Sequence, residues 1–75
     1  MASRLILRIQ ERSARLTSSE KKIAHVLLQN QSLVETHTAT ELAAKAGVSK
    51  ATTARFFRSL GYAYFEEVRL QAREE

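Results

Sequence analysis

The feature that most limits the fold of this chain is how few of its residues interrupt a helix. Its 75 residues include no proline and two glycines, Gly47 and Gly61. Alanine, leucine, arginine, glutamate and glutamine, which all favour helix, dominate the sequence. No run of alternating β-branched residues indicates a strand. The sequence therefore predicts an all-α fold whose helices end at the two glycines and begin at capping residues.

Capping signals and the spacing of apolar residues together predict five helices. Thr17 with Glu20, and Thr38 with Glu41, have the spacing of capping boxes, in which side chain and backbone cap each other. Ser49 is placed to cap a further helix. The expected helices span about 3–14, 18–29, 39–46, 50–60 and 63–73. We therefore predict a compact five-helix bundle with short connections.

Apolar side chains that recur at helical spacing are expected to form one small core. In chain order they are Leu5, Ile6, Ile9, Ile23, Val26, Leu27, Leu33, Val34, Leu42, Ala43, Ala46, Phe56, Phe57, Leu60, Tyr62, Phe65, Val68 and Leu70. Leu33 and Val34 are expected to reach this core from a short turn. A chain of this length buries only about 60% of the surface that it exposes when unfolded, so its stability is expected to be marginal.

Residues 38–60 combine two short helices with a tight turn. The first helix is rich in alanine, and the small side chains of Ala43 and Ala46 allow the second helix to cross it closely. Gly47 can adopt the positive φ that the turn needs, and Val48 closes the small core between the helices. This combination is the signature of the helix-turn-helix, whose second helix enters the major groove of DNA.

The outward face of the second helix is expected to be small at its start and basic further on. On a wheel of 100° per residue, Ala51, Arg55 and Arg58 lie opposite the apolar side. Small side chains permit close approach to the groove, and arginine can bind guanine O6 and N7 with two hydrogen bonds. Hydroxyls at helix starts can bind phosphates. The predicted DNA-binding residues are Thr38, Ser49, Lys50, Ala51, Thr52, Arg55 and Arg58.

Positive charge is concentrated in the same part of the chain. The formal net charge is +4, and residues 42–65 contain no acidic residue. The basic residues of that window are Lys45, Lys50, Arg55 and Arg58. An asymmetry of this kind is typical of a surface that binds phosphates.

The composition also argues against several other classes of protein. Without cysteine, the chain has no disulfide, no thiolate zinc site and no cysteine nucleophile. His25 and His37 lie on different elements without carboxylate or cysteine neighbours, so neither a metal nor a cofactor is expected. No nucleophile–base pair or glycine-rich phosphate loop can be assembled, so we do not expect an enzyme. No apolar run approaches the roughly 20 residues of a membrane span, and a cytoplasmic protein without a membrane partner is expected.

Two alternative interpretations remain open from the residues alone. The aromatic residues Phe56, Phe57, Tyr62 and Phe65 could stack on the bases of a single strand, although their helical spacing favours the core. The chain could also be a basic protein-interaction or dimerisation module without specific DNA binding, which would bind its partner through the first helix. The apolar arc of that helix is wide, and we expect part of it to contact a second copy.

Several short motifs occur together along the chain: Leu16-Thr17-x-x-Glu20, Glu41-Leu42-Ala43, Ala46-Gly47-Val48-Ser49, Ala51-Thr52, Arg55-Phe56 and Leu60-Gly61-Tyr62. With them, the chain resembles the N-terminal domain of RpiR-type bacterial transcriptional regulators from about Leu5 to Arg73. The resemblance implies a helix-turn-helix fold, homeodomain-like or winged-helix-like, that binds operator DNA as a homodimer. A symmetric dimer would read a palindromic operator.

The resemblance also implies a second domain and shows two departures from the family pattern. The family carries a C-terminal sugar-isomerase-type domain that senses a phosphosugar, so residues 1–75 are expected to be the DNA-binding fragment of a longer regulator. A small-molecule effector would act through that domain. Thr53 stands where the family usually has a branched apolar residue, and its hydroxyl needs a local acceptor if it is buried. Ala63 stands where a small polar residue is common, so no phosphate contact is expected from its side chain.

Overall fold

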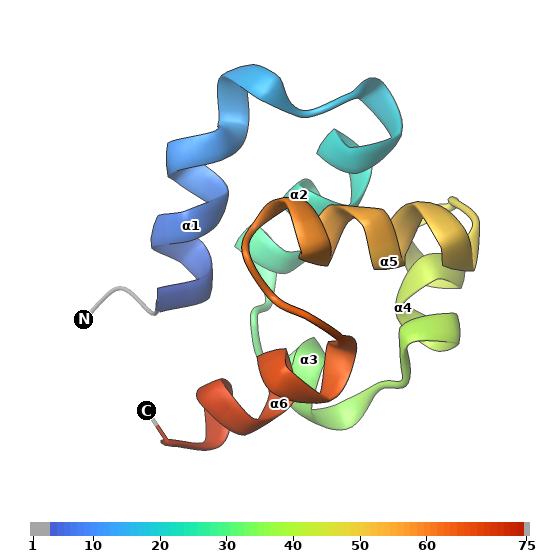
Figure 1. Cartoon of the computed structure of the whole chain (residues 1–75). Helices are drawn as coiled ribbons and strands as arrows, with labels where there is room; N and C mark the ends of the chain where they lie inside the picture. The colour runs from blue at the N-terminus through green and yellow to red at the C-terminus, as the bar shows by residue number, and fades with distance from the viewer. Residues whose placement is uncertain (1–3, 75) are drawn as a thin grey trace.

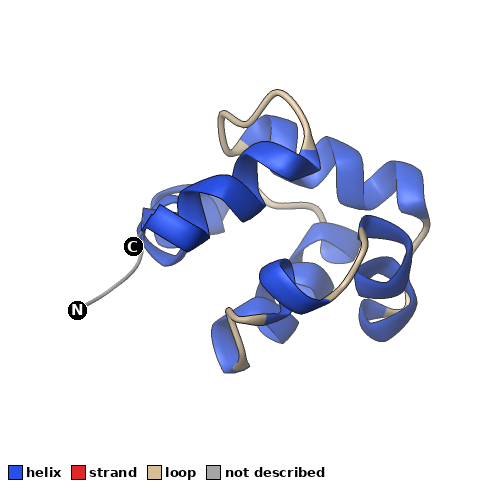
Figure 2. Ribbon diagram, turned by 90° about the horizontal axis from the view of Figure 1, so that it is seen from below, coloured by secondary structure: helices blue, strands red, loops and turns tan. Residues whose placement is uncertain are grey.

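In the computed structural model, which describes residues 4–74, the chain is a set of short helices packed around one core (Figure 1). The helices are α1 (Arg4–Arg12), α2 (Ser18–Gln29), α3 (Leu33–Thr36), α4 (Ala39–Ala46), α5 (Lys50–Ser59) and α6 (Phe65–Glu74), with a 3-10 turn, η1 (Ser13–Arg15), after α1. Figure 2 shows only helices and loops over this described range. The prediction of an all-α fold is therefore confirmed.

The prediction of five helices is wrong, because the structure has six α-helices within residues 4–74. The additional one, α3, is the single helical turn that carries Leu33 and Val34 into the core. It is closed by the amide of His37, which donates to the carbonyl of Leu33 at 3.0 Å. A segment of four residues is too short for apolar periodicity to indicate a helix. Burial of its two apolar side chains, rather than local propensity, therefore explains this turn.

The boundaries of the other helices that lie within residues 4–74 agree with the sequence to within two residues. The expected start of the first helix, residue 3, lies outside the described residues. The last helix begins at Phe65 instead of residue 63, because Gly61 has a φ of 100° and Tyr62 turns into the core. The amide of Ala63 then donates to the side chain of Glu67 at 3.0 Å, which caps the start of α6.

Both predicted capping boxes are formed. At the start of α2, the Glu20 amide donates to the Thr17 hydroxyl at 3.2 Å, and the Thr17 amide donates to the Glu20 carboxylate at 2.9 Å. At the start of α4, the corresponding bonds between Thr38 and Glu41 measure 3.1 and 2.9 Å. Each box satisfies backbone amides that the helix itself leaves unpaired. The start of α4 is thus fixed by local contacts.

The core is centred on α5, which packs against both α2 and α4. Phe56 and Phe57 from α5 are almost completely buried, and their rings meet edge to face at 5.2 Å between centroids. Thr53 is fully buried beside them, and its hydroxyl donates to the carbonyl of Ser49 at 3.3 Å, the local acceptor that the sequence demanded. The prediction that Leu70 belongs to the core is wrong. Its side chain is 50% exposed, because α6 turns Val68 toward the core.

Arg69 ties α6 to the segment that precedes α4. Its Nε donates to the carbonyl of Val34 at 3.1 Å, and its Nη2 donates to the carbonyl of His37 at 2.6 Å. Its remaining nitrogen, Nη1, forms an ion pair with Glu66 at 3.0 Å, and the guanidinium lies 5.3 Å from the centre of the Phe65 ring. One side chain therefore holds two backbone carbonyls just before the helix-turn-helix begins.

Candidate nucleic-acid interface

The turn between α4 and α5 has the geometry that the sequence predicted. Gly47 ends α4 with φ 72° and ψ 34°, which is the left-handed region. The amide of Val48 then donates to the carbonyl of Ala43 at 3.0 Å, which closes the end of the helix as in a Schellman motif. Ala43 and Ala46 are buried on α4, and α4 packs against α5. The two helices of the motif are therefore held at a defined angle by backbone geometry and small side chains.

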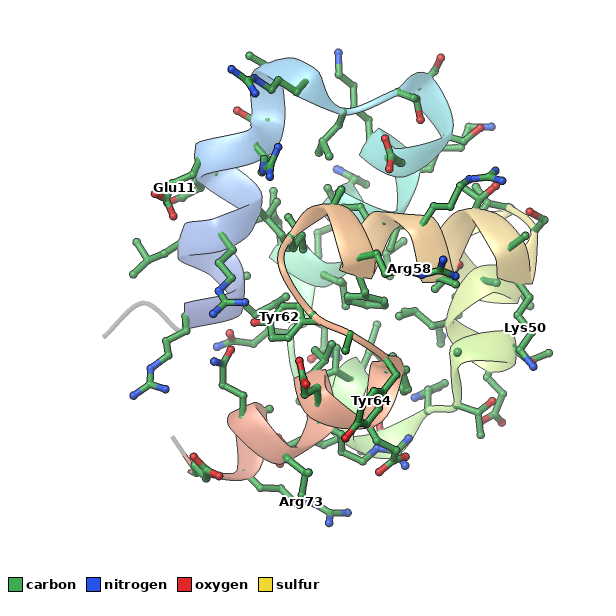
Figure 3. The ribbon with its side chains drawn as sticks, viewed as in Figure 1. Glu11, Lys50, Arg58, Tyr62, Tyr64 and Arg73 are labelled. Atoms are coloured by element: carbon green, nitrogen blue, oxygen red, sulfur yellow. The ribbon has the colours of Figure 1, made fainter. Side chains whose placement is uncertain are left out.

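Helix α5 has one buried face and one exposed face. Thr53, Phe56 and Phe57 are buried within the helix, and Leu60 is buried at its C-cap. Ala51, Arg55 and Arg58 are exposed, as is Lys50 at the first position. Figure 3 shows Lys50 and Arg58 toward opposite ends of α5. The prediction that α5 has a buried apolar face and an exposed face is confirmed. The exposed side chains include small Ala51 near the start and the basic residues Arg55 and Arg58 further on.

A chain of polar contacts links three of the predicted DNA-binding residues. The Ser49 hydroxyl accepts from the Thr52 amide at 3.0 Å and lies 2.8 Å from the Thr52 hydroxyl. The Arg55 Nη2 donates to that same Thr52 hydroxyl at 3.3 Å. Thr52 is half-buried, whereas Ser49 and Arg55 are exposed. The contact orients Arg55 along the outward face and uses one of the five N–H groups of its guanidinium.

The start of α5 differs from the starts of α2 and α4 in its charge. In the two capping boxes the third helical position is glutamate, Glu20 or Glu41, whereas in α5 it is Thr52. The hydrogen bond that Glu41 accepts from the Thr38 amide lowers the pKa of its carboxyl, so a negative charge sits at the start of α4. No acidic residue occupies the first turn of α5. The positive end of the α5 dipole is therefore open to a phosphate.

Thr38 lies apart from the predicted DNA-binding residues at the start of α5. It caps the end of α4 that is opposite to Gly47, and its hydroxyl and amide are both bonded to Glu41. The other six predicted residues lie in α5 or at its N-cap. A phosphate contact from Thr38 stays a prediction, and it would have to form beside the Glu41 carboxylate.

Sequence reasoning missed an arginine cluster, formed by Arg8, Arg12 and Arg15, at the opposite end of α5. The Arg8 Nη1 donates to the carbonyl of Leu60 at 3.2 Å, and its guanidinium lies 4.4 Å from the centre of the Tyr62 ring. A Cβ at position 61 would lie 3.4 Å from that nitrogen, so glycine leaves room for the contact. The signal was the spacing of four and then three residues between the arginines, which places them on one side of a helix.

The remaining candidate groups have structural surroundings. Phe56, Phe57 and Tyr62 are buried, so they are not available to stack on bases. His37 lies 2.8 Å from the hydroxyl of Thr36 through its Nδ1. Within residues 4–74 no three histidine or acidic side chains are grouped as a metal site would require. Over the same range, no helix is both long and apolar enough to span a membrane.

Comparison with known proteins relates the chain to transcriptional regulators. The helix-turn-helix domain of the rpiR family matches residues 3–75. The HTH-type transcriptional regulator HexR of Pseudomonas aeruginosa is 37% identical over 67 residues, which cover 89% of this chain and 24% of the regulator. An uncharacterized HTH-type transcriptional regulator of Haemophilus influenzae is 41% identical over 56 residues, covering 75% of this chain and 19% of the relative.

The regulator YfhH of Escherichia coli, also described as uncharacterized and HTH-type, is 35% identical over 69 residues, covering 92% of this chain and 24% of YfhH. The chain thus spans about a quarter or less of the length of these relatives. No solved structure matches the chain significantly. The match over nearly its whole length, together with the helix-turn-helix geometry, shows that this chain belongs to the rpiR family of helix-turn-helix domains.

Proposed function

We propose that this chain binds double-stranded DNA sequence-specifically, as the operator-reading domain of a bacterial transcriptional regulator. The observation that carries the proposal is α5, which is buried on one side and presents Ala51, Arg55 and Arg58 on the other. An α-helix with its side chains is about 10–12 Å across, and the major groove is about 12 Å wide. A helix of this width and charge, with no carboxylate in its first turn, fits the groove.

The proposed roles follow from position along α5. Arg55 lies on the outward face and binds base edges, with Ala51 allowing the helix to approach closely. Ser49 and Thr52 lie at the helix start, where hydroxyls and free amides bind phosphate, and Lys50 adds a positive charge there. Arg58, one turn further on, contacts DNA toward the C-terminal end of the helix. Thr38 is proposed to contribute a phosphate contact from the start of α4.

We further propose that the domain acts in the cytoplasm as half of a symmetric dimer on a palindromic operator. The half-sites would lie about one or two helical turns apart. On α1, Leu5 and Ile9 are buried in the core, whereas Leu7 is 48% exposed, which leaves Leu7 available for a contact with a second copy. The much greater length of the relatives supports a further domain, through which a phosphosugar effector would act.

Selection from a random duplex library is the experiment that tests this proposal. The chain is expected to enrich a palindromic sequence and to bind it with an affinity that falls steeply with salt, because arginine and lysine displace counterions from phosphates. A protein-interaction module would instead enrich no sequence and would show no shift with duplex DNA at low salt. Failure to enrich any duplex would overturn the proposal.

Replacing Arg55 with alanine is expected to weaken binding to the selected operator by about 1–3 kcal/mol and to relax specificity at one base position. The reason is the loss of a bidentate contact to guanine. Fluorescence anisotropy with the operator and its single-base variants measures both effects. Arg55→Lys is the matched variant, because it keeps the charge but lacks the planar guanidinium that donates two parallel hydrogen bonds. Equal operator affinity for wild type and Arg55→Ala would contradict the assignment.

Replacing Lys50 with alanine is expected to weaken binding to operator and unrelated duplexes by the same factor. The physical reason is that a phosphate contact carries no sequence information. The slope of log K against log salt should fall in magnitude by about one. Titrations at several salt concentrations measure this slope, and Lys50→Arg should restore it. A slope unchanged in Lys50→Ala would rule out the phosphate contact.

A further inference from the structure

A hollow of about 310 Å³ lies between the end of α1 and the C-terminal end of α5. Its lining consists of the arginine cluster, Glu11 and Leu60. Leu60 is the C-cap of α5, and its carbonyl is bonded to Arg8, so the cluster begins where α5 ends. Figure 1 shows α1 beside this end of α5, with α4 beside the other. The hollow is therefore separate from the proposed contacts at the start of α5.

The described residues that line the hollow carry a net positive charge. Three guanidinium groups and one carboxylate line it. Arg8 is half-buried and held by Leu60 and Tyr62, whereas Arg12 and Arg15 are exposed. The ion pair that the structure gives within residues 4–74 joins Arg69 to Glu66, on another helix, and Glu11 is not bonded to either exposed arginine. Arg12 and Arg15 thus keep their donors for an external anion.

The position of the hollow relative to α5 indicates which anion it meets. A recognition helix contacts base edges with its N-terminal residues, and its C-terminal end then lies near the rim of the groove, where phosphates line the duplex. The C-terminal end of a helix is negative and by itself disfavours phosphate. Arg8 covers the Leu60 carbonyl at that end, and Arg12 and Arg15 extend the positive surface beyond it.

From this geometry we propose that the arginine cluster is a second phosphate-binding surface, at which Arg12 and Arg15 bind the DNA backbone beyond the C-terminal end of α5. Arg8 is the positioning residue that fixes α1 against that end. The duplex would then be held at both ends of the helix, by Ser49 and Lys50 at one and by the cluster at the other. This inference rests on the proposed DNA-binding function.

Charge-neutralising substitutions in the full chain test the proposal. Arg12→Gln and Arg15→Gln are each expected to lower the affinity for operator and unrelated duplexes by about fivefold to tenfold at 0.1 M salt, with the salt slope falling by about 0.9. Arg73→Gln is the matched control, because Arg73 is an exposed arginine on α6. Glu11→Gln removes the carboxylate from the hollow and is expected to raise affinity, a gain that a folding defect does not produce.

The possible outcomes separate this inference from the proposed function. If wild type binds a selected operator and Arg12→Gln and Arg15→Gln change its affinity no more than Arg73→Gln does, the cluster does not contact DNA. Binding of inorganic phosphate tests whether the cluster is a site for small anions rather than for DNA. If phosphate binding depends on Arg12 and Arg15 while DNA binding does not, the proposal is wrong. If wild type selects no duplex, the proposed function itself fails. Ethylation of an operator phosphate weakens binding where the protein contacts that phosphate. A smaller effect at the same phosphates in Arg12→Gln and in Arg15→Gln than in wild type would support the proposal.

Discussion

Replacing Phe56 with alanine is expected to remove roughly half of the stability of this domain. The side chain is fully buried on α5, in edge-to-face contact with Phe57, in the helix that packs against α2 and α4. Truncating a buried phenylalanine costs about 3–5 kcal/mol, because the cavity collapses only in part. A domain of this size has a total unfolding free energy of about 4–11 kcal/mol. At the middle of these two ranges the loss is roughly half of the total, so the urea midpoint of the variant should fall far below that of wild type.

Urea unfolding followed by far-UV circular dichroism measures this effect. Tyr64→Ala is the matched control, because it also removes an aromatic ring but from a site that is 59% exposed. Its unfolding free energy should stay within about 0.5 kcal/mol of wild type. An unfolding midpoint for Phe56→Ala equal to that of Tyr64→Ala would mean that Phe56 does not support the core. Operator binding by Phe56→Ala should fall with the folded fraction.

Replacing Arg69 with alanine is expected to lower the unfolding free energy by about 2–4 kcal/mol, the second largest effect. The variant leaves the carbonyls of Val34 and His37 without their charged donor, and it removes the cover over the Phe65 ring. Because both carbonyls precede α4, amide hydrogen exchange should accelerate most in α3 and at the start of α4.

Two further variants show whether the guanidinium geometry is what matters at this position. Arg69→Lys keeps the charge but lacks the planar fork that reaches two carbonyls at once, so it should recover only part of the lost stability. Arg73→Ala removes an exposed arginine from the same helix and should change the unfolding free energy little. Equal stability of Arg69→Ala and Arg73→Ala would show that the link from α6 to the segment before α4 contributes nothing.

The features that the sequence predicted well are those set by neighbouring residues. Each capping box joins a threonine to a glutamate three residues away, and the turn at Gly47 depends on the φ of one residue. The two faces of α5 follow from its helical period, which is why Phe56 could be assigned to the core and Arg55 to the surface. Most of the proposed DNA contacts are of this local kind.

The features that the sequence did not predict depend on residues far apart in the chain. Arg8 and Leu60 are 52 positions apart, and Arg69 and Val34 are 35 positions apart. Periodicity within one helix identifies neither partner, so neither contact was predicted. The exposure of Leu70 has the same origin, because the rotation of α6 is decided by what Arg69 and Val68 contact. The arginine cluster depends in the same way on the packing of α1 against the end of α5.

The division of α5 into two faces has a consequence for engineering and for evolution. Positions 51, 55 and 58 are exposed, whereas the residues that hold the helix in place are buried, and surface substitutions of this kind usually change stability by less than about 0.5 kcal/mol. A library randomised at these three positions should therefore remain folded in most of its members. Selecting that library against altered operators offers a route to new specificities on an unchanged scaffold.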